Sequence, residues 1–230
     1  MDHKKMILVG GWCMLLFSIL FVGITIITDY LASNVTVIYS LEHQGLFTVV
    51  AASKAIQAWL VAWALTPLLL IPAAVGSYYA FQQRYEANMR VGMYFATTGA
   101  IAFAMSLMLL PSFTWQFSGY LPMLSGQAQV LGVLILKSMH YYFGMFIGDI
   151  LGLGCILIWL LITSIVAIRS KVLPVILGWI GFILVLFIFL ILAVRYFEIV
   201  PNIHANIQVG ALLALWFFIF GIGLVSLKRD

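Results

Sequence analysis

The stretch that decides the fold is HYYFGMFIGDILGLGCILIWLLITSIVAIRSKVLPVILGWIGFILVLFIFL, residues 140–190. It holds two long apolar runs, at about 145–168 and from 173 onward, which the short basic turn RSKVLP separates. A helix needs roughly 20 apolar residues to cross the hydrocarbon core of a bilayer. Each run is about that long, so the stretch predicts two transmembrane helices joined by a tight turn.

The composition of the whole chain has the same character. Of 230 residues, 65% are hydrophobic and 8% are charged, and the mean hydropathy is +1.17. A soluble domain carries about 25% charged residues, so this chain has too little polar surface for a water-exposed globule. The net charge of +4 comes from basic residues scattered at helix ends, which does not indicate nucleic-acid binding. The two cysteines lie in apolar runs and predict no disulfide framework.

Several stretches are apolar and long enough to span a bilayer. They lie at about 6–28, 55–81, 91–110, 145–168, 173–194 and 208–227. The first shares features with a signal peptide, but its apolar run is long for one and lacks a cleavage site of small residues. We therefore expect it to be retained. The sequence predicts an all-α integral membrane protein, a bundle of six transmembrane helices that forms one polytopic domain over residues 1–230.

The basic residues set the expected orientation of this bundle. With a cytoplasmic N-terminus, eight Lys and Arg residues fall inside and three fall outside, in agreement with the positive-inside rule. The inside residues are Lys4, Lys5, Arg84, Arg90, Arg169, Lys171, Lys228 and Arg229. The outside residues are Lys54, Lys137 and Arg195. Both termini are thus predicted to be cytoplasmic.

The segment 111–144 is predicted to be an interfacial segment at the outer surface. It contains Trp115, Phe117 and Tyr120, aromatic residues that suit the headgroup layer. Its second part, QAQVLGVLILKSM at 127–139, allows two interpretations. It is either an amphipathic helix on the outer surface or an outward extension of the fourth spanning helix.

Two features inside the predicted bundle concern helix packing. Gly144, Gly148 and Gly152 are spaced by four residues and fall on one helix face, which favours close approach of a neighbouring backbone or, alternatively, a ligand crevice. Pro67 and Pro72 lie in the second stretch and predict a kinked helix, because proline removes a backbone donor and clashes with the preceding turn. The two prolines are candidate hinge residues, since transporters use broken helices.

The remaining polar groups gather on the predicted outer side, where they form a candidate site. Its members are Asp149, His140, Lys137, Arg195, Glu198 and Lys54. Counting back from Arg169 at 1.5 Å per residue places Asp149 near the outer boundary of the roughly 30 Å hydrocarbon core. In a regular α-helix His140 lies roughly 180° around from Asp149, so the two do not form a catalytic couple. Asp149 is expected to pair with an outer-side cation.

No catalytic residues are predicted, and no cofactor is implied by a motif. The chain lacks GxSxG, CxxC and a glycine-rich phosphate-binding loop. His43, His140 and His204 are weak candidates for zinc or copper ligands on the outer face, because imidazole suits those metals. No two of them have a diagnostic spacing, and interfacial histidines bonded to loop backbone are the simpler interpretation.

Residues 140–190 resemble a family of bacterial multi-spanning membrane proteins of unknown function. In that family a histidine and aromatic-glycine stretch leads into a glycine-rich helix, a basic turn with Leu-Pro, and a helix opened by Leu-Gly. The matching positions are His140, Gly144, Gly148, Gly152, Arg169, Lys171, Leu173, Pro174, Leu177 and Gly178. Asp149 departs from the pattern. The resemblance implies a multi-pass protein of the bacterial cytoplasmic (inner) membrane, and it implies no activity.

Three functions remain open at this point. We expect an accessory or structural subunit of a larger membrane complex, whose partners are the lipid bilayer and either other membrane-protein subunits or further copies of the chain. The first alternative is a small transporter or channel that uses Asp149 and the helix kinked at Pro67 and Pro72. The second is a metal-binding enzyme of the outer face. No nucleic-acid partner is expected.

Overall fold

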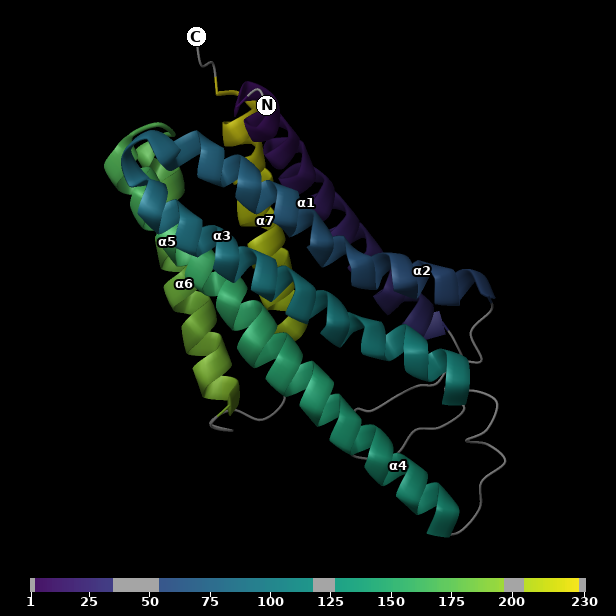
Figure 1. The fold of residues 1–230 in the computed structure, drawn as a ribbon. Helices are drawn as coiled ribbons and strands as arrows, with labels where there is room; N and C mark the ends of the chain where they lie inside the picture. The colour runs from purple at the N-terminus through teal and green to yellow at the C-terminus, as the bar shows by residue number, and fades with distance from the viewer. Residues whose placement is uncertain (1–2, 35–53, 118–126, 197–204, 228–230) are drawn as a thin grey trace.

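The computed structural model describes residues 3–34, 54–117, 127–196 and 205–227, and in these ranges the chain is helical throughout, apart from short turns, with no strand. The all-α class predicted from the sequence is therefore confirmed. The helices are α1 (His3–Asn34), α2 (Lys54–Leu65), η1 (Thr66–Leu69), α3 (Leu70–Phe117), α4 (Gln127–Met139), η3 (His140–Leu153), α5 (Gly154–Ser170), α6 (Val175–Tyr196) and α7 (Ala205–Val225). Figure 1 shows them as a bundle of long, roughly aligned rods.

Four of the described helical stretches are long and apolar enough to cross a membrane. They are His3–Gly23, Ala58–Leu109, Tyr141–Ser170 and Val175–Val194. A shorter apolar helix covers Gly210–Val225. The chain thus has the make-up of a membrane protein, as its composition predicts.

The stretch Ala58–Leu109 contains a chain reversal. The backbone of Tyr85 leaves the helical region with φ −132° and ψ 36°, in the middle of α3. On either side of this break the two arms of α3 run back along each other (Figure 1). The reversal falls in the polar link QQRYEANMR, since charged and amide side chains are expensive inside an apolar bundle. The second arm continues to Phe117, beyond the predicted stretch 91–110.

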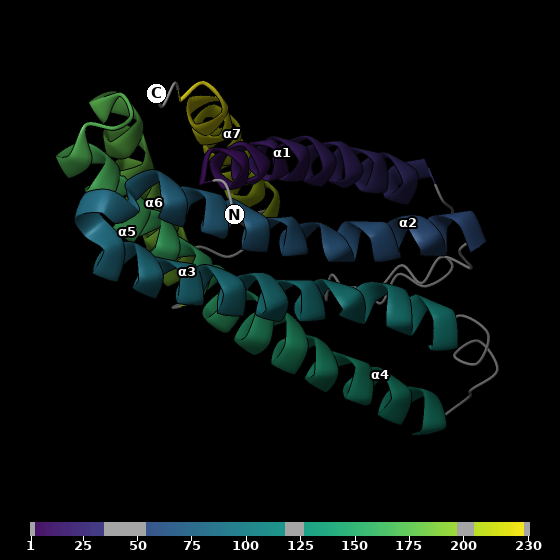
Figure 2. The ribbon, with the colours of Figure 1, turned by 45° about the horizontal axis from the view of Figure 1, so that its top comes forward.

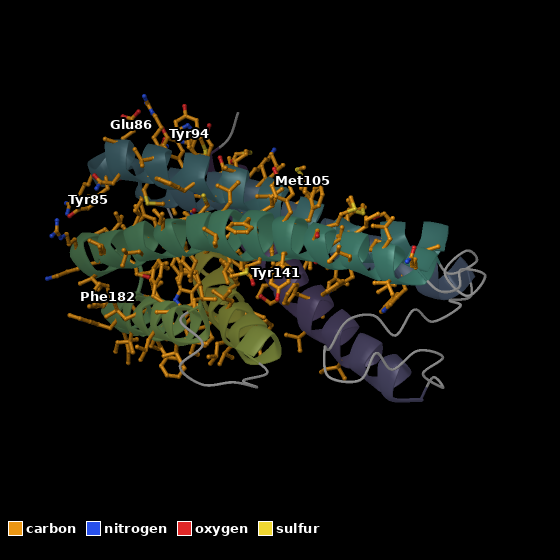
Figure 3. All side chains as sticks on the ribbon, turned by 90° about the horizontal axis from the view of Figure 1, so that it is seen from below. Tyr85, Glu86, Tyr94, Met105, Tyr141 and Phe182 are labelled. Carbon is orange, nitrogen blue, oxygen red and sulfur yellow. The ribbon has the colours of Figure 1, made fainter. Side chains whose placement is uncertain are left out.

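The segment 127–139 continues the next helix. Met139 and Gly154, the residues that flank η3, both have right-handed helical dihedrals, so α4, η3 and α5 follow one another without a break. Figure 3 shows them as one long rod. Residues 127–170 are more than twice the roughly 20 residues that cross a hydrocarbon core. Of the two interpretations of 127–139, the structure has the outward extension.

The tight turn between α5 and α6 is built as the sequence predicts. Helix α5 ends at Ser170, and Lys171 adopts the left-handed conformation with φ 55°. The backbone N–H of Val172 donates to the Ser170 Oγ at 3.4 Å, and the N–H of Leu177 donates to the carbonyl of Pro174 at 2.9 Å. These bonds satisfy part of the backbone that a helix end leaves without partners.

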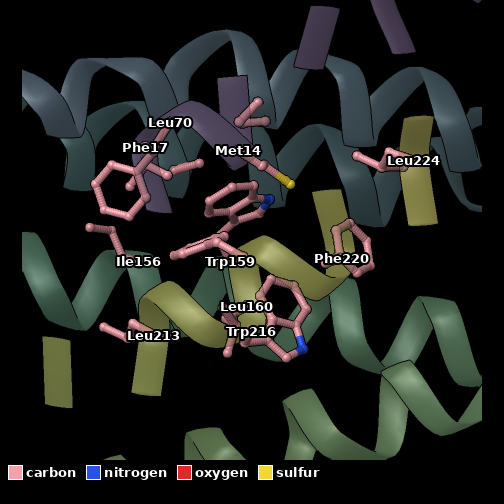
Figure 4. Packing of buried hydrophobic residues seen from close by; sticks show 14 of the residues in the cluster. Met14, Phe17, Leu70, Ile156, Trp159, Leu160, Leu213, Trp216, Phe220 and Leu224 are labelled. Atoms are coloured by element: carbon pink, nitrogen blue, oxygen red, sulfur yellow. The ribbon is translucent and has the colours of Figure 1, made fainter. Parts of the chain in front are cut away.

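The core lies where α1, α3, α5 and α7 meet (Figure 4). Trp159 of α5 is 1% exposed and stacks on Phe217 of α7 with ring centroids 5.5 Å apart. Phe17 of α1 meets the same ring edge-on at 5.5 Å. Offset and edge-to-face aromatic pairs add about 0.5–1.5 kcal/mol beyond burial. Aromatic residues of α1, α5 and α7 therefore pack against one another and stabilise the centre of the bundle.

Helix α1 approaches its two neighbours closely through glycines. A Cβ at Gly10 would lie 2.5 Å from the Cα of Gly76 in α3, and one at Gly11 would lie 3.1 Å from the carbonyl oxygen of Gly221 in α7. Figure 2 shows α1 lying alongside α7 and the first arm of α3. Small residues allow such backbone contact in apolar bundles, where packing replaces the hydrophobic effect between helices.

Candidate functional site

Asp149, the central residue of the predicted outer site, lies in the π-helical segment η3. The backbone N–H of Gly154 bonds to the Asp149 carbonyl, five residues back, which is the π-helical pattern. The Asp149 side chain is half-buried, and Asp149 takes part in an interaction within the chain. Single-turn π-bulges inside α-helices occur frequently at functional sites, and η3 is longer than such a bulge. Asp149 also lies within the apolar stretch Tyr141–Ser170, where an ionisable residue is expensive.

The π-helical pairing changes the geometry expected for His140 and Asp149. The predicted separation of roughly 180° assumes 3.6 residues per turn. Because the N–H groups of η3 bond five residues back, each residue turns the chain by less than in an α-helix. The α-helical estimate of the angle therefore does not apply to this segment, and the relation of the two side chains stays a prediction. The structure describes the backbone of His140 but not its side chain.

The other members of the predicted outer site are not brought to Asp149 by any described contact. Lys54, Lys137 and Arg195 lie in described helices whose side chains at these positions are outside the described part, and Glu198 lies outside the described residues altogether. The outer-face polar site stays a prediction.

The glycine stripe of η3 lies against α3. A Cβ at Gly152 would come 2.9 Å from the backbone nitrogen of Phe103, and one at Gly148 would overlap the side chain of Ser106. From the opposite side, a Cβ at Gly99 would lie 2.8 Å from the Gly152 carbonyl oxygen. Gly144 is half-buried. At Gly148 and Gly152 the stripe is thus filled by the neighbouring helix and leaves no room for a ligand.

The proline pair stands at a change of helix type. Pro67 is buried and is the second residue of the 3-10 segment η1, which joins α2 to α3, and Pro72 follows in the first turn of α3. The Thr66 hydroxyl donates to the carbonyl of Trp63 at 2.7 Å and so satisfies one acceptor near the break. A Cβ on Gly10 of α1 would lie 3.1 Å from the Pro72 carbonyl oxygen. The interruption is therefore packed against α1, and a hinge there stays a prediction.

The metal-ligand candidates cannot be placed together. His43 and His204 lie outside the described residues, and the His140 side chain is not described. Among the described side chains, no three His, Cys, Asp or Glu residues are grouped as a metal site would require. Cys13 and Cys155 are both free thiols.

Sequence reasoning missed a group of buried polar atoms on α5. Trp159 Nε1, Thr163 Oγ1 and Ser164 Oγ are buried and have no hydrogen-bond partner in the described part of the chain. Hydroxyls and indole N–H groups without partners cost free energy in an apolar interior. No sequence signal marks them, because Ser and Thr in a membrane helix usually bond to a carbonyl one turn back.

Sequence reasoning also missed a polar network at the end of the bundle where α3 reverses. His3 of α1 and Gln82 of α3 share a hydrogen bond of 2.9 Å, and the His3 ring lies 4.9 Å from that of Tyr79. A few residues on, Arg90 forms an ion pair with Glu86. Figure 3 labels Glu86 and Tyr85 at this end. The network fixes the start of α1 to the reversal of α3.

Together the fold and these groups define an all-helical membrane protein without a described catalytic centre. Comparison of the chain with protein-family models, with curated proteins and with solved structures finds no match. The resemblance of residues 140–190 to a bacterial membrane family therefore stays a prediction.

Proposed function

We propose that this chain is a six-span membrane protein with both termini in the cytoplasm, and that it serves as an accessory or structural subunit of a larger membrane complex. The six spans are supported by the reversal at Tyr85, which divides Ala58–Leu109 into two arms. The orientation is supported by Figure 1, where the reversal of α3, the α5–α6 turn, the start of α1 and the end of α7 lie at the same end of the bundle. A bacterial inner membrane is the location that the predicted family implies.

The observation that carries the subunit role is the apolar surface of α4. Val130, Leu131, Leu134 and Ile135 are 69%, 58%, 58% and 47% exposed. Among the described helices the main contacts of α4 are with η3, which continues it in the same rod, and Figure 2 shows α4 diverging from the rest of the bundle.

The position of α4 makes this surface unusual. If the end of α5 at Ser170 marks one membrane boundary, about 20 residues of the rod fill the hydrocarbon core, and α4 lies beyond it. Burying a Leu, Val or Ile side chain stabilises by about 1.5–3 kcal/mol. A second membrane protein whose extramembrane part covers α4 would gain this free energy.

Site-directed photocrosslinking in native membranes tests the role. A photoreactive residue at Leu134 should give an adduct of one defined mass, and V130A/L131A in the same chain should reduce that adduct. The matched control is Ile183 of α6, which is 62% exposed on a stretch that spans the membrane and should face lipid. A monodisperse monomer in mild detergent with no adduct at Leu134 would remove the proposal. Crosslinking to lipid at Leu134 would assign α4 to the membrane surface instead.

A second function, transport of a proton or small cation, is favoured by one observation. The π-helical segment η3 places a half-buried carboxylate, Asp149, inside an apolar stretch of spanning length. Many transporters build their ion sites from interrupted helices, and ionisable residues within the membrane mark ion pathways. Purified protein in liposomes should then show flux that D149N abolishes and that E86Q, an exposed carboxylate control, leaves unchanged. The absence of flux from the native protein would exclude this function.

A further inference from the structure

A cleft opens at the end of the bundle where α3 reverses and α5 turns into α6. Its lining residues are Ala80, Phe81, Gln83, Arg84, Ser170, Lys171 and Val172, and its volume is about 210 Å³. The α3 residues and the α5–α6 turn are far apart in the sequence, so only the fold forms this cleft. A volume of this size has room for a small anionic group.

The side chains of the cleft are cationic and hydrogen-bond donating. Arg84 and Lys171 are both exposed. Neither has an ion pair in the described part of the chain. Glu86, the carboxylate nearest to Arg84 in the sequence, already pairs with Arg90 and accepts a hydrogen bond from Tyr78 at 3.4 Å. An Arg fork and a Lys ammonium are the groups that recognise phosphate.

The backbone adds little charge of its own to the cleft. Helix α5 ends at Ser170 and presents its negative pole here, whereas α6 begins at Val175 and presents its positive pole nearby. The two contributions oppose each other, so the side chains decide the sign. The Ser170 Oγ accepts the Val172 N–H, which leaves its own hydroxyl hydrogen available to a ligand.

Because the turn that lines the cleft joins two helices of spanning length, we expect the cleft at the depth of lipid headgroups. Lys171 directly follows the apolar stretch Tyr141–Ser170, and Val175–Val194 begins a few residues later. Next to the turn, α6 exposes Ile176 and Ile180, at 65% and 41%, and this face continues to Ile183. Residues four and three apart share a helix face. The turn that lines the cleft is therefore followed along the chain by an exposed apolar face of α6, which acyl chains can contact.

We propose that this cleft binds the phosphate of an anionic phospholipid headgroup. The ligand chemistry is a phosphate ester oxyanion held by Arg84 and Lys171, with the acyl chains along the exposed face of α6. Basic pockets between membrane helices are known to bind anionic headgroups. A free phosphate would use the same cations but would gain nothing from α6. The proposal is independent of the subunit role, since it requires only that the chain lies in a membrane.

The test uses the full chain in bilayer nanodiscs and measures binding of a fluorescent phosphatidylglycerol. R84Q and K171G should each weaken binding by about fivefold, the effect of one basic residue at a membrane surface. K171G retains the left-handed backbone that the turn requires, and R84Q is an independent second variant, so a fold defect in one does not decide the result. R90Q is the matched control, because Arg90 is a cation of the same end that is already paired with Glu86.

Each outcome of this test is decisive. Loss in R84Q and K171G with binding retained in R90Q supports the lipid site. An equal loss in all three variants would show unspecific attraction to the basic end and overturn it. Inorganic phosphate is the second probe: if it competes at millimolar concentration and phosphatidylglycerol gains nothing over it, the ligand is free phosphate and the lipid assignment is wrong.

Discussion

At the scale of single residues, glycines decide how closely the helices pack. Gly10 and Gly76 bring α1 and α3 so close that no Cβ fits between them, whereas a Cβ at Gly23 of α1 would meet none of the described residues within 4 Å. Gly148 and Gly152 act in the same way between η3 and α3. Glycine therefore permits a close contact between helices at Gly10, whereas at Gly23 of the same helix α1 no described neighbour requires it.

The first residue-scale prediction compares two Gly→Ala substitutions in α1. G10A should lower the free energy of unfolding by about 1–3 kcal/mol, the cost of overpacking. G23A should be neutral or raise it by up to about 1 kcal/mol, because alanine is the better helix former. Thermal unfolding in detergent measures both. Equal effects of the two variants would contradict the contact between Gly10 and Gly76.

The second residue-scale prediction concerns Thr163, which is fully buried with no described hydrogen-bond partner. T163V keeps the shape and removes the hydroxyl, so it should raise the unfolding free energy by about 1 kcal/mol. S77A is the comparison, because the Ser77 hydroxyl donates to the Ala74 carbonyl at 2.8 Å and its loss should cost about 0.5–1.5 kcal/mol. A destabilised T163V would show that Thr163 has a partner such as buried water.

At the scale of elements, irregular helical segments stand where the sequence carries unusual residues. The 3-10 segment η1 begins beside Pro67, the break of α3 falls at Tyr85 in a polar link, and the π-segment η3 contains Asp149. The turn between α5 and α6 depends on one left-handed residue, Lys171. A residue with a Cβ in this conformation costs roughly 1–2 kcal/mol.

The element-scale prediction follows from the left-handed Lys171. K171G should raise the unfolding free energy by about 1 kcal/mol, because glycine adopts a positive φ without strain. K171V should lower it, since a β-branched side chain is least tolerant of this conformation. Thermal unfolding of the full chain in detergent measures the stability of both variants. If K171G and K171V behave alike, the turn does not require positive φ.

At the scale of the whole molecule, the bundle has one basic end and one apolar extension. The reversal of α3, the α5–α6 turn, the start of α1 and the end of α7 lie together, and α4 extends toward the other end (Figure 1). The exposed faces of the spanning helices carry large apolar residues, which suit contact with lipid. The proposed orientation rests on the difference between the basic end and the end toward which α4 extends.

The molecular-scale prediction concerns the two ends of the bundle. In a chain whose native cysteines are replaced by alanine, N88C lies close to the reversal of α3 and Q127C at the start of α4, and both positions are exposed. A membrane-impermeant maleimide should label Q127C in intact cells and N88C only after the membrane is opened. Labelling of both from one side would contradict the proposed six-span arrangement.

Prediction from sequence succeeded for local features and failed for those that need distant partners. The helices and the α5–α6 turn were predictable because the length of an apolar run and a basic, Pro-containing turn are properties of neighbouring residues. The π-helical pairing of η3 was not, because its sequence has the same apolar pattern as an α-helix. In the candidate outer site, Asp149 is the one member whose side chain the structure describes. The basic cleft was missed although both of its turns are visibly basic.

The sequence by itself determined that this chain is helical and belongs in a membrane, because its shortage of charged residues leaves no other solvent for its side chains. It also located the hairpin of residues 140–190. Only the tertiary structure decided that α4 extends the fourth rod, that Gly10 meets Gly76, and that Arg84 faces the same cleft as Lys171. These features join residues far apart in the chain, and their energies depend on packing between helices that no local pattern encodes.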